Sequence, residues 1–184
     1  MPWDLGEPTP VFNQWINSEG NTLSICILGA GNGWDALNFA EKGHDVTAVD
    51  FSFTAIENMR KISHKRGIDI NILHSDIFNI GKSYNAAFDI VLEYTCYCAI
   101  DPDRRIDYVN LVDRILKPAG RLVALFFPLG KELNNEGPPF LVDLNSTLNL
   151  FSKIFYLNKK EIPKLSIERR IGREMFVILN KNGK

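Results

Sequence analysis

A glycine-rich turn and a later aspartate are the residues with the clearest chemistry in this sequence. The turn is Gly29-Ala30-Gly31-Asn32-Gly33, and its glycines tolerate positive φ and let the backbone approach a ligand closely. Asp50 follows roughly 20 residues later, the spacing at which a carboxylate accepts hydrogen bonds from the ribose of a bound nucleotide. Together the two features predict a site for a nucleoside.

A second aspartate extends this site. Asp76 lies in the run His74-Ser75-Asp76-Ile77-Phe78, where its carboxylate would accept a hydrogen bond from the amino group of adenine. Ile77 and Phe78 would then cover the ring. Charge-assisted bonds of this kind contribute about 1.5 to 3 kcal/mol each when water is excluded. The alternative for Asp76 is a role as a turn or cap residue.

The spacing within the turn distinguishes two cofactors. Dinucleotide sites carry G-x-G-x-x-G, with a diphosphate on the helix N-terminus, whereas the third glycine position here is Trp34. Asp35 follows in the first turn of the expected helix, where a carboxylate would repel a diphosphate and accept a bond from an ammonium group. S-adenosylmethionine has a ribose, an adenine, an amino-acid end and no phosphate, so it fits these residues better than a dinucleotide.

Short apolar runs that alternate with amphipathic stretches must position these residues. The apolar runs predict strands at 22–28, 45–49, 69–73, 88–94 and 121–127. Helices are expected to start at Trp34, at a Thr54–Glu57 capping box and at Asp101-Pro102. Because parallel neighbours need crossover connections, this alternation predicts a parallel sheet with helices on both faces. The ligand would bind beyond the carboxyl ends of the strands, at the glycine turn.

The last third of the chain has a different pattern. A loop rich in Gly, Pro and Asn covers 130–139, and a helix is expected near 145–152. The strands expected at 153–157 and 174–180 have no helix between them, which predicts an antiparallel pair at one sheet edge. The predicted fold class is therefore α/β, a Rossmann-like three-layer sandwich around a mostly parallel sheet with an antiparallel C-terminal hairpin.

Composition and charge exclude several classes of function. The 184 residues are 45% hydrophobic and 23% charged, which is typical of a globular protein, and we expect a single domain, 1–184. A net charge of -1 provides no basic field for nucleic acid or anionic lipid. The sequence shows neither a signal peptide nor the ~20 apolar residues of a membrane span. We expect a cytoplasmic monomer or weak homo-oligomer with no nucleic-acid or membrane partner.

The cysteines and histidines indicate neither disulfides nor a metal. Cys26, Cys96 and Cys98 form no C-x-x-C pair, and their odd number favours reduced thiols. The 3 histidines share no i,i+4 spacing and lie beside no cysteine cluster, so the ligand spacings of a zinc site are missing. We expect no metal ion in this protein.

With these residues in view, the sequence resembles the class I S-adenosylmethionine-dependent methyltransferases, and within them the thiopurine, thiol and halide methyltransferase family. Several stretches carry the resemblance, and they look like the family's W-D-x-G-x-P-x-P, acidic-Y-x-x-F-C-A-I-[DE]-P, L-K-P-x-G, G-P-P-[FY] and R-x-G-x-E segments. These stretches are Trp3 to Pro10, Glu93 to Pro102, Leu116 to Gly120, Gly137 to Phe140 and Arg170 to Glu174. The second is the most specific, and together they cover nearly the whole chain.

The resemblance implies a seven-stranded sheet with a reversed final strand and S-adenosylmethionine at the carboxyl ends of the strands. Residues 1–20 would form an N-terminal lid, in which Trp3 closes over the cofactor. The implied cofactor-binding residues are Trp3, Gly29, Gly31, Gly33, Asp35, Asp50, Phe51, Asp76, Ile77, Phe78 and Glu93.

The resemblance also implies methyl transfer to a small soft nucleophile such as a thiol, a thiopurine or a halide. Methyl transfer from a sulfonium is an in-line displacement, so the enzyme chiefly aligns the nucleophile and excludes water. Glu93 and Tyr94 are the expected catalytic residues, at the boundary between sulfonium and acceptor. The expected acceptor-binding residues are Phe12, Tyr94, Tyr97 and Phe140, and the alternative for Phe12 is core packing.

Two other classes of function remain open at this point. One is a module that keeps the cofactor pocket without catalysing transfer. The other is a nicotinamide-dependent oxidoreductase, which the residues Trp34 and Asp35 oppose.

Overall fold

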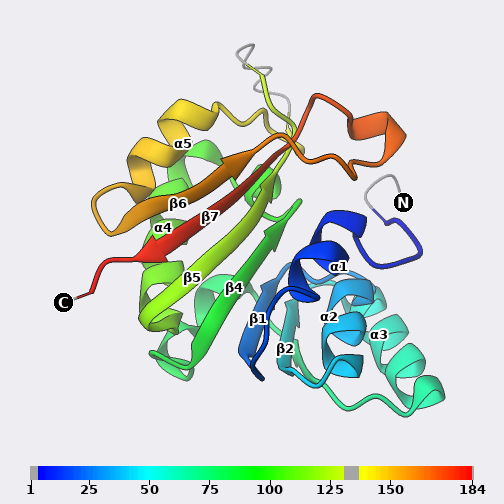
Figure 1. The fold of residues 1–184 in the computed structure, drawn as a ribbon. Helices are drawn as coiled ribbons and strands as arrows, with labels where there is room; N and C mark the ends of the chain where they lie inside the picture. Colours follow the sequence, from blue (N-terminus) through cyan, green and yellow to red (C-terminus); the bar gives the residue numbers. More distant parts are fainter. Residues whose placement is uncertain (1–3, 131–136, 184) are drawn as a thin grey trace.

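The apolar runs of the sequence form one sheet, with strand order β3-β2-β1-β4-β5-β7-β6, in a computed structural model that describes residues 4–130 and 137–183 (Figure 1). The strands are β1 (Ser24–Leu28), β2 (Asp45–Asp50), β3 (Asn71–His74), β4 (Phe88–Tyr94), β5 (Leu116–Phe126), β6 (Phe155–Glu161) and β7 (Met175–Lys181). The first five are parallel, and β7 runs antiparallel between β5 and β6. The predicted fold class, with its seven-stranded sheet and reversed last strand, is confirmed.

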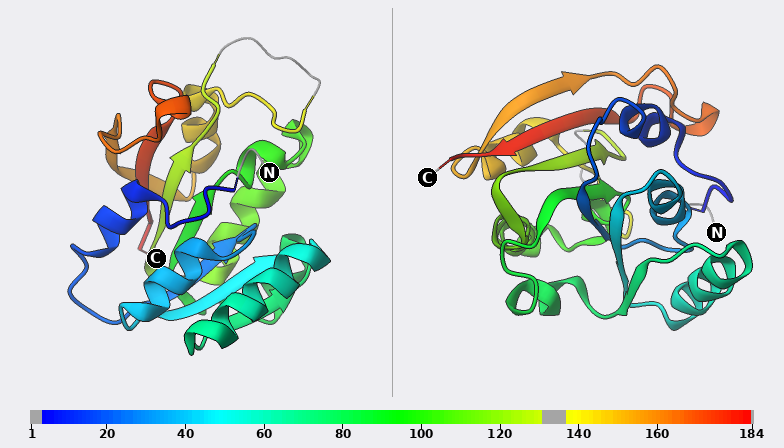
Figure 2. Two further views of the ribbon diagram at one scale, coloured as in Figure 1. Left: turned by 90° about the vertical axis from the view of Figure 1, so that its right-hand side faces the viewer. Right: turned by 60° about the horizontal axis from the view of Figure 1, so that its bottom comes forward.

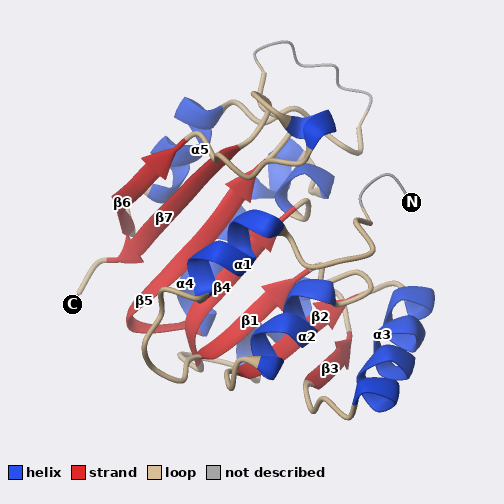
Figure 3. Cartoon of the chain, turned by 45° about the vertical axis from the view of Figure 1, so that its right-hand side comes forward, coloured by secondary structure: helices blue, strands red, loops and turns tan. Residues whose placement is uncertain are grey.

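Helices cover both faces of this sheet (Figures 2 and 3). The α-helices are α1 (Pro10–Ile16), α2 (Trp34–Glu41), α3 (Phe53–Arg66), α4 (Arg105–Ile115) and α5 (Leu144–Phe151). The short 3-10 helices in the described part of the chain are η1 (Ile77–Lys82), η2 (Tyr97–Ala99), η3 (Pro102–Arg104) and η4 (Glu168–Arg170). Side chains of α1, α2 and α3 form one apolar core with the sheet, and those of η1, α4 and α5 form the other. The protein is therefore three layers thick, with one core on each side of the sheet.

Several boundaries differ from the sequence prediction for local reasons. The helix α3 is capped by Ser52, whose side chain accepts a hydrogen bond from the Ala55 N–H, so the Thr54–Glu57 capping box is wrong. The strand β5 begins at Leu116, before the expected start at 121, and its pairing with β4 shifts register between Phe88 and Ile90. The helix α1 lies within the segment expected only as a lid.

The strand order places a ligand crevice at one end of the sheet. The chain winds outward from β1 to β2 and β3, and then returns to place β4 on the other side of β1. At such a reversal the loops diverge and leave a crevice beyond the carboxyl ends of the strands. The glycine turn follows β1 directly and reaches this crevice. Within the described ranges, none of the helices has the length and apolar character needed to cross a membrane.

The substitution Gly33→Ala tests how tightly the glycine turn packs against α3. The φ of Gly33 is +78°, and a Cβ at this position would lie 2.5 Å from Met59 Cγ, so Gly33→Ala combines backbone strain with overpacking. We expect it to lower the free energy of unfolding by about 2 to 4 kcal/mol, measured by denaturant titration. Gly67→Ala is the matched control, since Gly67 has φ +63° but open space around it, and it should cost about 1 kcal/mol. Equal losses would contradict the packing argument.

Candidate functional site

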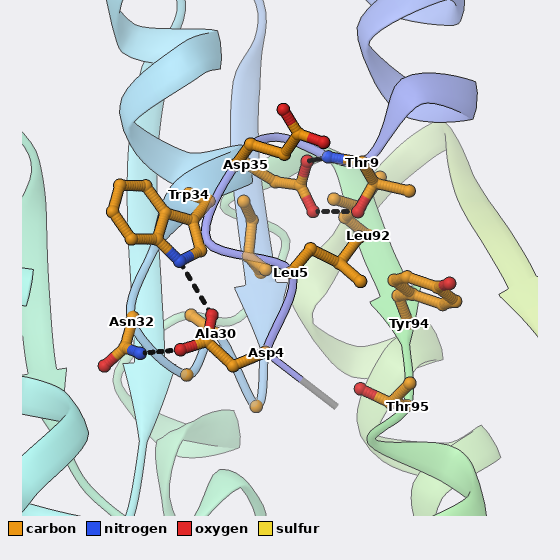
Figure 4. A pocket seen from close by; sticks show the side chains of 14 residues that line it. Asp4, Leu5, Thr9, Ala30, Asn32, Trp34, Asp35, Leu92, Tyr94 and Thr95 are labelled. Atoms are coloured by element: carbon orange, nitrogen blue, oxygen red, sulfur yellow. Dashed lines mark hydrogen bonds between the residues drawn. The ribbon is translucent and has the colours of Figure 1, made fainter. Parts of the chain in front are cut away.

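A crevice opens between the glycine turn, the end of β4 and the N-terminal segment (Figure 4). Its lining residues are Asp4, Leu5, Glu7, Thr9, Ile27, Gly29, Ala30, Gly31, Asn32, Trp34, Asp35, Leu92, Tyr94 and Thr95. The side chains of Asp4, Glu7 and Asp35 contribute carboxylates, and none of the described lining residues is a lysine or an arginine. The crevice is therefore suited to a ligand that carries positive charge and no phosphate.

The glycines of the turn are required by close contacts. Gly29 has φ +66°, and a Cβ there would lie 3.0 Å from Cys96 Cβ and 3.1 Å from Cys96 Sγ. Gly31 also has positive φ, at 56°, and its N–H points toward the end of β2. At these two glycines the backbone can thus line the crevice directly, because neither residue has a side chain.

Asp50 fixes the turn to the end of β2. One carboxylate oxygen accepts a hydrogen bond from the Gly31 N–H at 2.7 Å, and the other accepts from the Ser52 N–H at 2.8 Å. The residue is buried, so these bonds replace lost hydration. A carboxylate offers about four acceptor positions, and each oxygen of Asp50 can therefore accept one more bond from a ligand hydroxyl.

Residues 4–9, which we call the N-terminal strap, cross the crevice and are held by the glycine turn and by the first turn of α2. The carboxylate of Asp4 accepts hydrogen bonds from the Asn32 amide and, at 2.8 Å, from Trp34 Nε1. Thr9 donates to the carboxylate of Asp35 through its backbone N–H and its hydroxyl, both at 2.8 Å. Figure 4 shows these bonds on one side of the crevice and Tyr94 on the other. Trp3, expected to close over the cofactor, lies outside the described residues.

Burial changes the acidity of Asp35. Loss of hydration raises its pKa to about 6, while the two hydrogen bonds from Thr9 act in the opposite direction. Desolvation of a carboxylate favours its neutral form unless a cation or N–H donors compensate. An ammonium group entering the crevice would provide such compensation.

The residues expected around adenine stand at the ends of β2 and β3. Asp76 caps η1, with its carboxylate accepting from the Phe78 N–H at 2.9 Å. Ile77 is buried, while the Arg104 guanidinium stacks on the Phe78 ring at 3.9 Å. Phe51 is 78% exposed, which is unusual for a phenyl ring and leaves it free to cover a flat ligand. The cap role of Asp76 occupies one of its acceptor positions and leaves others open.

Glu93 and Tyr94 face opposite sides of the sheet. Successive side chains on a strand alternate between faces, so Tyr94 lines the crevice with Leu92 while Glu93 does not. Glu93 is 1% exposed and accepts from the Tyr97 N–H and the Tyr108 hydroxyl, both at 2.8 Å. Burial raises its pKa to about 7, although these bonds lower it. In this structure Glu93 holds the turn after β4 in place, and its expected contact with sulfonium or acceptor stays a prediction.

Three of the four expected acceptor-binding side chains lie outside the crevice. Phe12 is fully buried and packs edge-on against Tyr94, with ring centroids 5.8 Å apart. Tyr97 is 1% exposed and packs in the core with Tyr108 and Phe126. Phe140 donates its N–H to the Cys98 carbonyl at 2.7 Å, and its side chain is not among the crevice residues. Phe12 and Tyr97 are therefore core residues, and of the four only Tyr94 lines the crevice.

Two buried charged residues beside Tyr94 had no role assigned from the sequence. The Arg170 guanidinium stacks on the rings of Tyr94 and Phe127, at 4.7 Å from each centroid. The Tyr94 hydroxyl donates to Glu174 at 3.2 Å. Only the R-x-G-x-E resemblance marked this stretch, because the contacts join residues about 80 positions apart, which local patterns do not reveal.

Similarity to known proteins agrees with this geometry. A probable thiol methyltransferase 2 of Arabidopsis thaliana is 31% identical over 78% of this chain, and the match spans 63% of that relative's length. A thiocyanate methyltransferase 1 of Brassica oleracea is 27% identical over 94% of the chain and 76% of its own length. A thiopurine S-methyltransferase of Vibrio campbellii is 25% identical over 97% of this chain and 90% of its own length.

Solved structures show the same fold at low sequence identity. A Burkholderia thailandensis 1,6-didemethyltoxoflavin-N1-methyltransferase with bound S-adenosylhomocysteine superposes with a TM-score of 0.78 at 18% identity, covering 94% of this chain and 77% of that one. A Methanosarcina mazei S-adenosylmethionine-dependent methyltransferase gives a TM-score of 0.78 at 16% identity, covering 97% and 100%. The family model for thiopurine S-methyltransferase matches residues 1–171, and the chain therefore belongs to this family.

Proposed function

We propose that this protein transfers a methyl group from S-adenosylmethionine to a small soft nucleophile such as a thiol, a thiopurine or a halide. The observation that carries the proposal is the acid-lined crevice at the glycine turn, which lacks basic side chains among its described lining. When bound, the cofactor supplies an electrophilic methyl group on a sulfonium. The residues of the site fit this cofactor, because carboxylates and backbone groups can bind its ammonium, ribose and adenine groups, and the cofactor has no phosphate to accommodate.

Each group of residues in and beside the crevice has a separate task in this proposal. Asp4, Glu7 and Asp35 line the crevice, whereas the residues assigned to the ribose and the adenine lie outside its described lining, at the ends of β2 and β3. Asp35 and the turn would hold the amino-acid end, with Asp4 and Glu7 adding negative charge around it. Asp50 would accept from the ribose hydroxyls, and Asp76 from the adenine amino group. The apolar side chains Phe51, Ile77 and Phe78 would cover the base. These assignments rest on the positions of the residues at the ends of β1, β2 and β3.

Catalysis would depend mainly on alignment and exclusion of water. Aligned reactants in a dry site reach effective molarities of about 10⁵ to 10⁸ M. Tyr94 lines the crevice at the end of β4, and burial raises the pKa of its hydroxyl, so it would act as a neutral wall and hydrogen-bonding group. Glu93, which is not among the crevice residues, would act as a positioning residue. The nucleophile would therefore arrive ionised or as a soft neutral sulfur.

The alternatives are weaker. Three carboxylates at the crevice oppose the diphosphate of a nicotinamide cofactor.

We also propose that the protein works in the cytoplasm as a monomer or weak homo-oligomer, with no nucleic-acid partner. A pI of about 6.3 and the free thiols of Cys26, Cys96 and Cys98 support this.

An acceptor panel tests the proposed reaction. The protein is incubated with methyl-labelled S-adenosylmethionine and with thiophenol, hydrogen sulfide, thiocyanate, iodide or 6-mercaptopurine, and labelled product is counted. We expect turnover with at least one sulfur or halide acceptor and none with the same acceptors and heat-denatured protein. Cofactor binding measured by calorimetry without product from any acceptor would favour a binding module instead.

Asp50→Asn tests the ribose assignment while preserving the shape of the side chain. Loss of charge-assisted bonds of about 1.5 to 3 kcal/mol should weaken the affinity for S-adenosylmethionine by about 10- to 100-fold, measured by calorimetry. Asp45→Asn is the matched control, because Asp45 is the exposed first residue of the same strand. Unchanged affinity in a folded Asp50→Asn protein would contradict the assignment.

Asp35 should make cofactor affinity depend on pH. Its pKa is raised to about 6, so the ionised form that attracts an ammonium group predominates above pH 6 and is lost below it. We expect affinity to fall as pH decreases through this value, and the step to disappear in Asp35→Asn. The raised pKa also means that ionisation costs stability, so Asp35→Asn should be at least as stable at pH 8. If the affinity of Asp35→Asn for the cofactor depended on pH as it does in the wild type, the proposed role of Asp35 in binding the ammonium group would be contradicted.

A further inference from the structure

Thr95 lines the crevice in a strained backbone conformation. Its φ is +62°, in the left-handed region that β-branched residues rarely adopt. Figure 4 shows Thr95 beside Tyr94, on the turn that follows β4. Strain of this kind persists only where the surrounding structure holds the backbone, and it is concentrated at functional sites. The contacts that hold this turn therefore indicate what the turn is for.

A buried carboxylate and a tyrosine hold the turn. Glu93 is 1% exposed, and one of its oxygens accepts a hydrogen bond from the Tyr97 N–H at 2.8 Å. The other oxygen accepts at 2.8 Å from the hydroxyl of Tyr108, a fully buried residue of α4. Glu93 precedes Thr95 by two residues and Tyr97 follows it by two, so the carboxylate joins the two ends of the strained turn. Between them, the Thr95 carbonyl accepts from the Cys98 thiol at 3.3 Å.

The same turn packs directly against the glycine turn. A Cβ on Gly29 would lie 3.0 Å from Cys96 Cβ and 3.1 Å from Cys96 Sγ, so Cys96 fills the space beside this glycine. Leu28 and Glu93 are paired in the sheet, and both turns therefore leave adjacent strands at the same level. Because Gly29 and Thr95 both line the crevice, a shift of the turn after β4 would change the shape of the crevice.

We propose that Tyr108 is a positioning residue for methyl transfer. Through the carboxylate of Glu93, it holds Thr95 and Cys96 at the distance from the glycine turn that aligns the sulfonium with its nucleophile. This inference rests on the proposed function and adds to the same site a residue of α4 that is not among the crevice residues. Tyr108 acts through the geometry of the turn and not through contact with a reactant.

This role predicts which constants depend on Tyr108. The residues proposed for the ribose and the adenine stand at the ends of β2 and β3, away from the turn after β4. In-line displacement depends steeply on alignment, and a misplacement of about 1 Å costs about 100-fold in rate. Loss of the Tyr108 hydroxyl should therefore lower kcat and leave the cofactor affinity and the acceptor KM close to their wild-type values.

Tyr108→Phe tests the proposal with the acceptor that gives the highest turnover in the panel above. We expect kcat to fall by about 10- to 100-fold at a temperature where the protein is folded, with the acceptor KM and the calorimetric affinity for S-adenosylmethionine retained. Ile115→Ala is the matched control, because Ile115 is a fully buried residue at the end of the same helix. It should lower stability and keep kcat. An unchanged kcat in folded Tyr108→Phe, or an equal loss in Ile115→Ala, would overturn the proposal.

A double-mutant cycle tests whether Tyr108 acts through Glu93. Glu93→Gln keeps the shape of the side chain and an oxygen that can accept from the Tyr97 N–H. In a Glu93→Gln background, Tyr108→Phe should have little further effect on kcat, because residues of one network are not additive. Two losses that simply multiply would overturn the route through Glu93.

Amide hydrogen exchange measured by NMR gives a readout that does not require turnover. Exchange of the Tyr97 N–H should be about 10- to 100-fold faster in Tyr108→Phe, the loss for a hydrogen bond to a charged group, while amides of β1 keep their wild-type rates. An unchanged rate at Tyr97, or the same acceleration throughout the sheet, would overturn the proposal. If the wild type transfers no methyl group, the proposed function fails separately, and this exchange experiment still decides whether Tyr108 holds the turn.

Glu93→Gln covers the case in which Tyr108→Phe does not fold. It replaces the charged partner of the Tyr108 hydroxyl by a neutral one of the same shape, and so weakens both hydrogen bonds of the network. A lower kcat together with faster exchange at Tyr97 would support the positioning role. A lower kcat with unchanged exchange would assign Glu93 to direct contact with a reactant and overturn it.

Discussion

The carboxylate of Asp50, shared between the Gly31 and Ser52 N–H groups, is the contact on which the crevice depends. It fastens the glycine-rich turn after β1 to the end of β2 and to the start of α3. Burial of this carboxylate is tolerable because N–H donors replace water. Asp35 and Glu93 follow the same rule, each held by a backbone N–H and a hydroxyl. Negative charge is thus concentrated at the carboxyl end of the sheet without neutralising lysines or arginines on those groups.

A buried cation lies beside the acidic crevice. The Arg170 guanidinium stacks on the ring of Tyr94, and the Tyr94 hydroxyl donates to the buried carboxylate of Glu174. The buried packing of Phe12 against Tyr94 keeps this ring in place at the edge of the crevice.

The sequence was sufficient for the sheet and for the turn because these depend on local patterns. Apolar runs, glycines at the end of β1 and an aspartate at the end of β2 are each readable within a few residues. The orientation of Glu93 was also readable, since alternation along a strand places it on the face opposite to Tyr94. The sequence analysis instead followed the family resemblance, which places Glu93 and Tyr94 together at the boundary between sulfonium and acceptor. Short α1 was missed because 7 residues carry too little periodicity to separate a helix from an extended segment.

The contacts that the sequence did not indicate join distant parts of the chain. No local pattern indicates that Tyr97 packs between α4 and β5, or that Thr9 reaches Asp35, because those partners are selected by the folded arrangement. Composition alone does not distinguish an aromatic residue that lines a crevice from one that fills the core. The burial of each aromatic side chain distinguishes the two cases, and burial depends on the order of the strands in the folded sheet.

The N-terminal strap has a consequence for the timing of the catalytic cycle. Its attachments at Asn32, Trp34 and Asp35 all lie on the turn and helix end that the cofactor would contact, so in the proposed function release of spent cofactor would be coupled to the breaking of these bonds. The indole of Trp34 would then exchange its carboxylate partner for water. Its fluorescence emission would then shift with each opening, which makes this tryptophan an intrinsic reporter of product release.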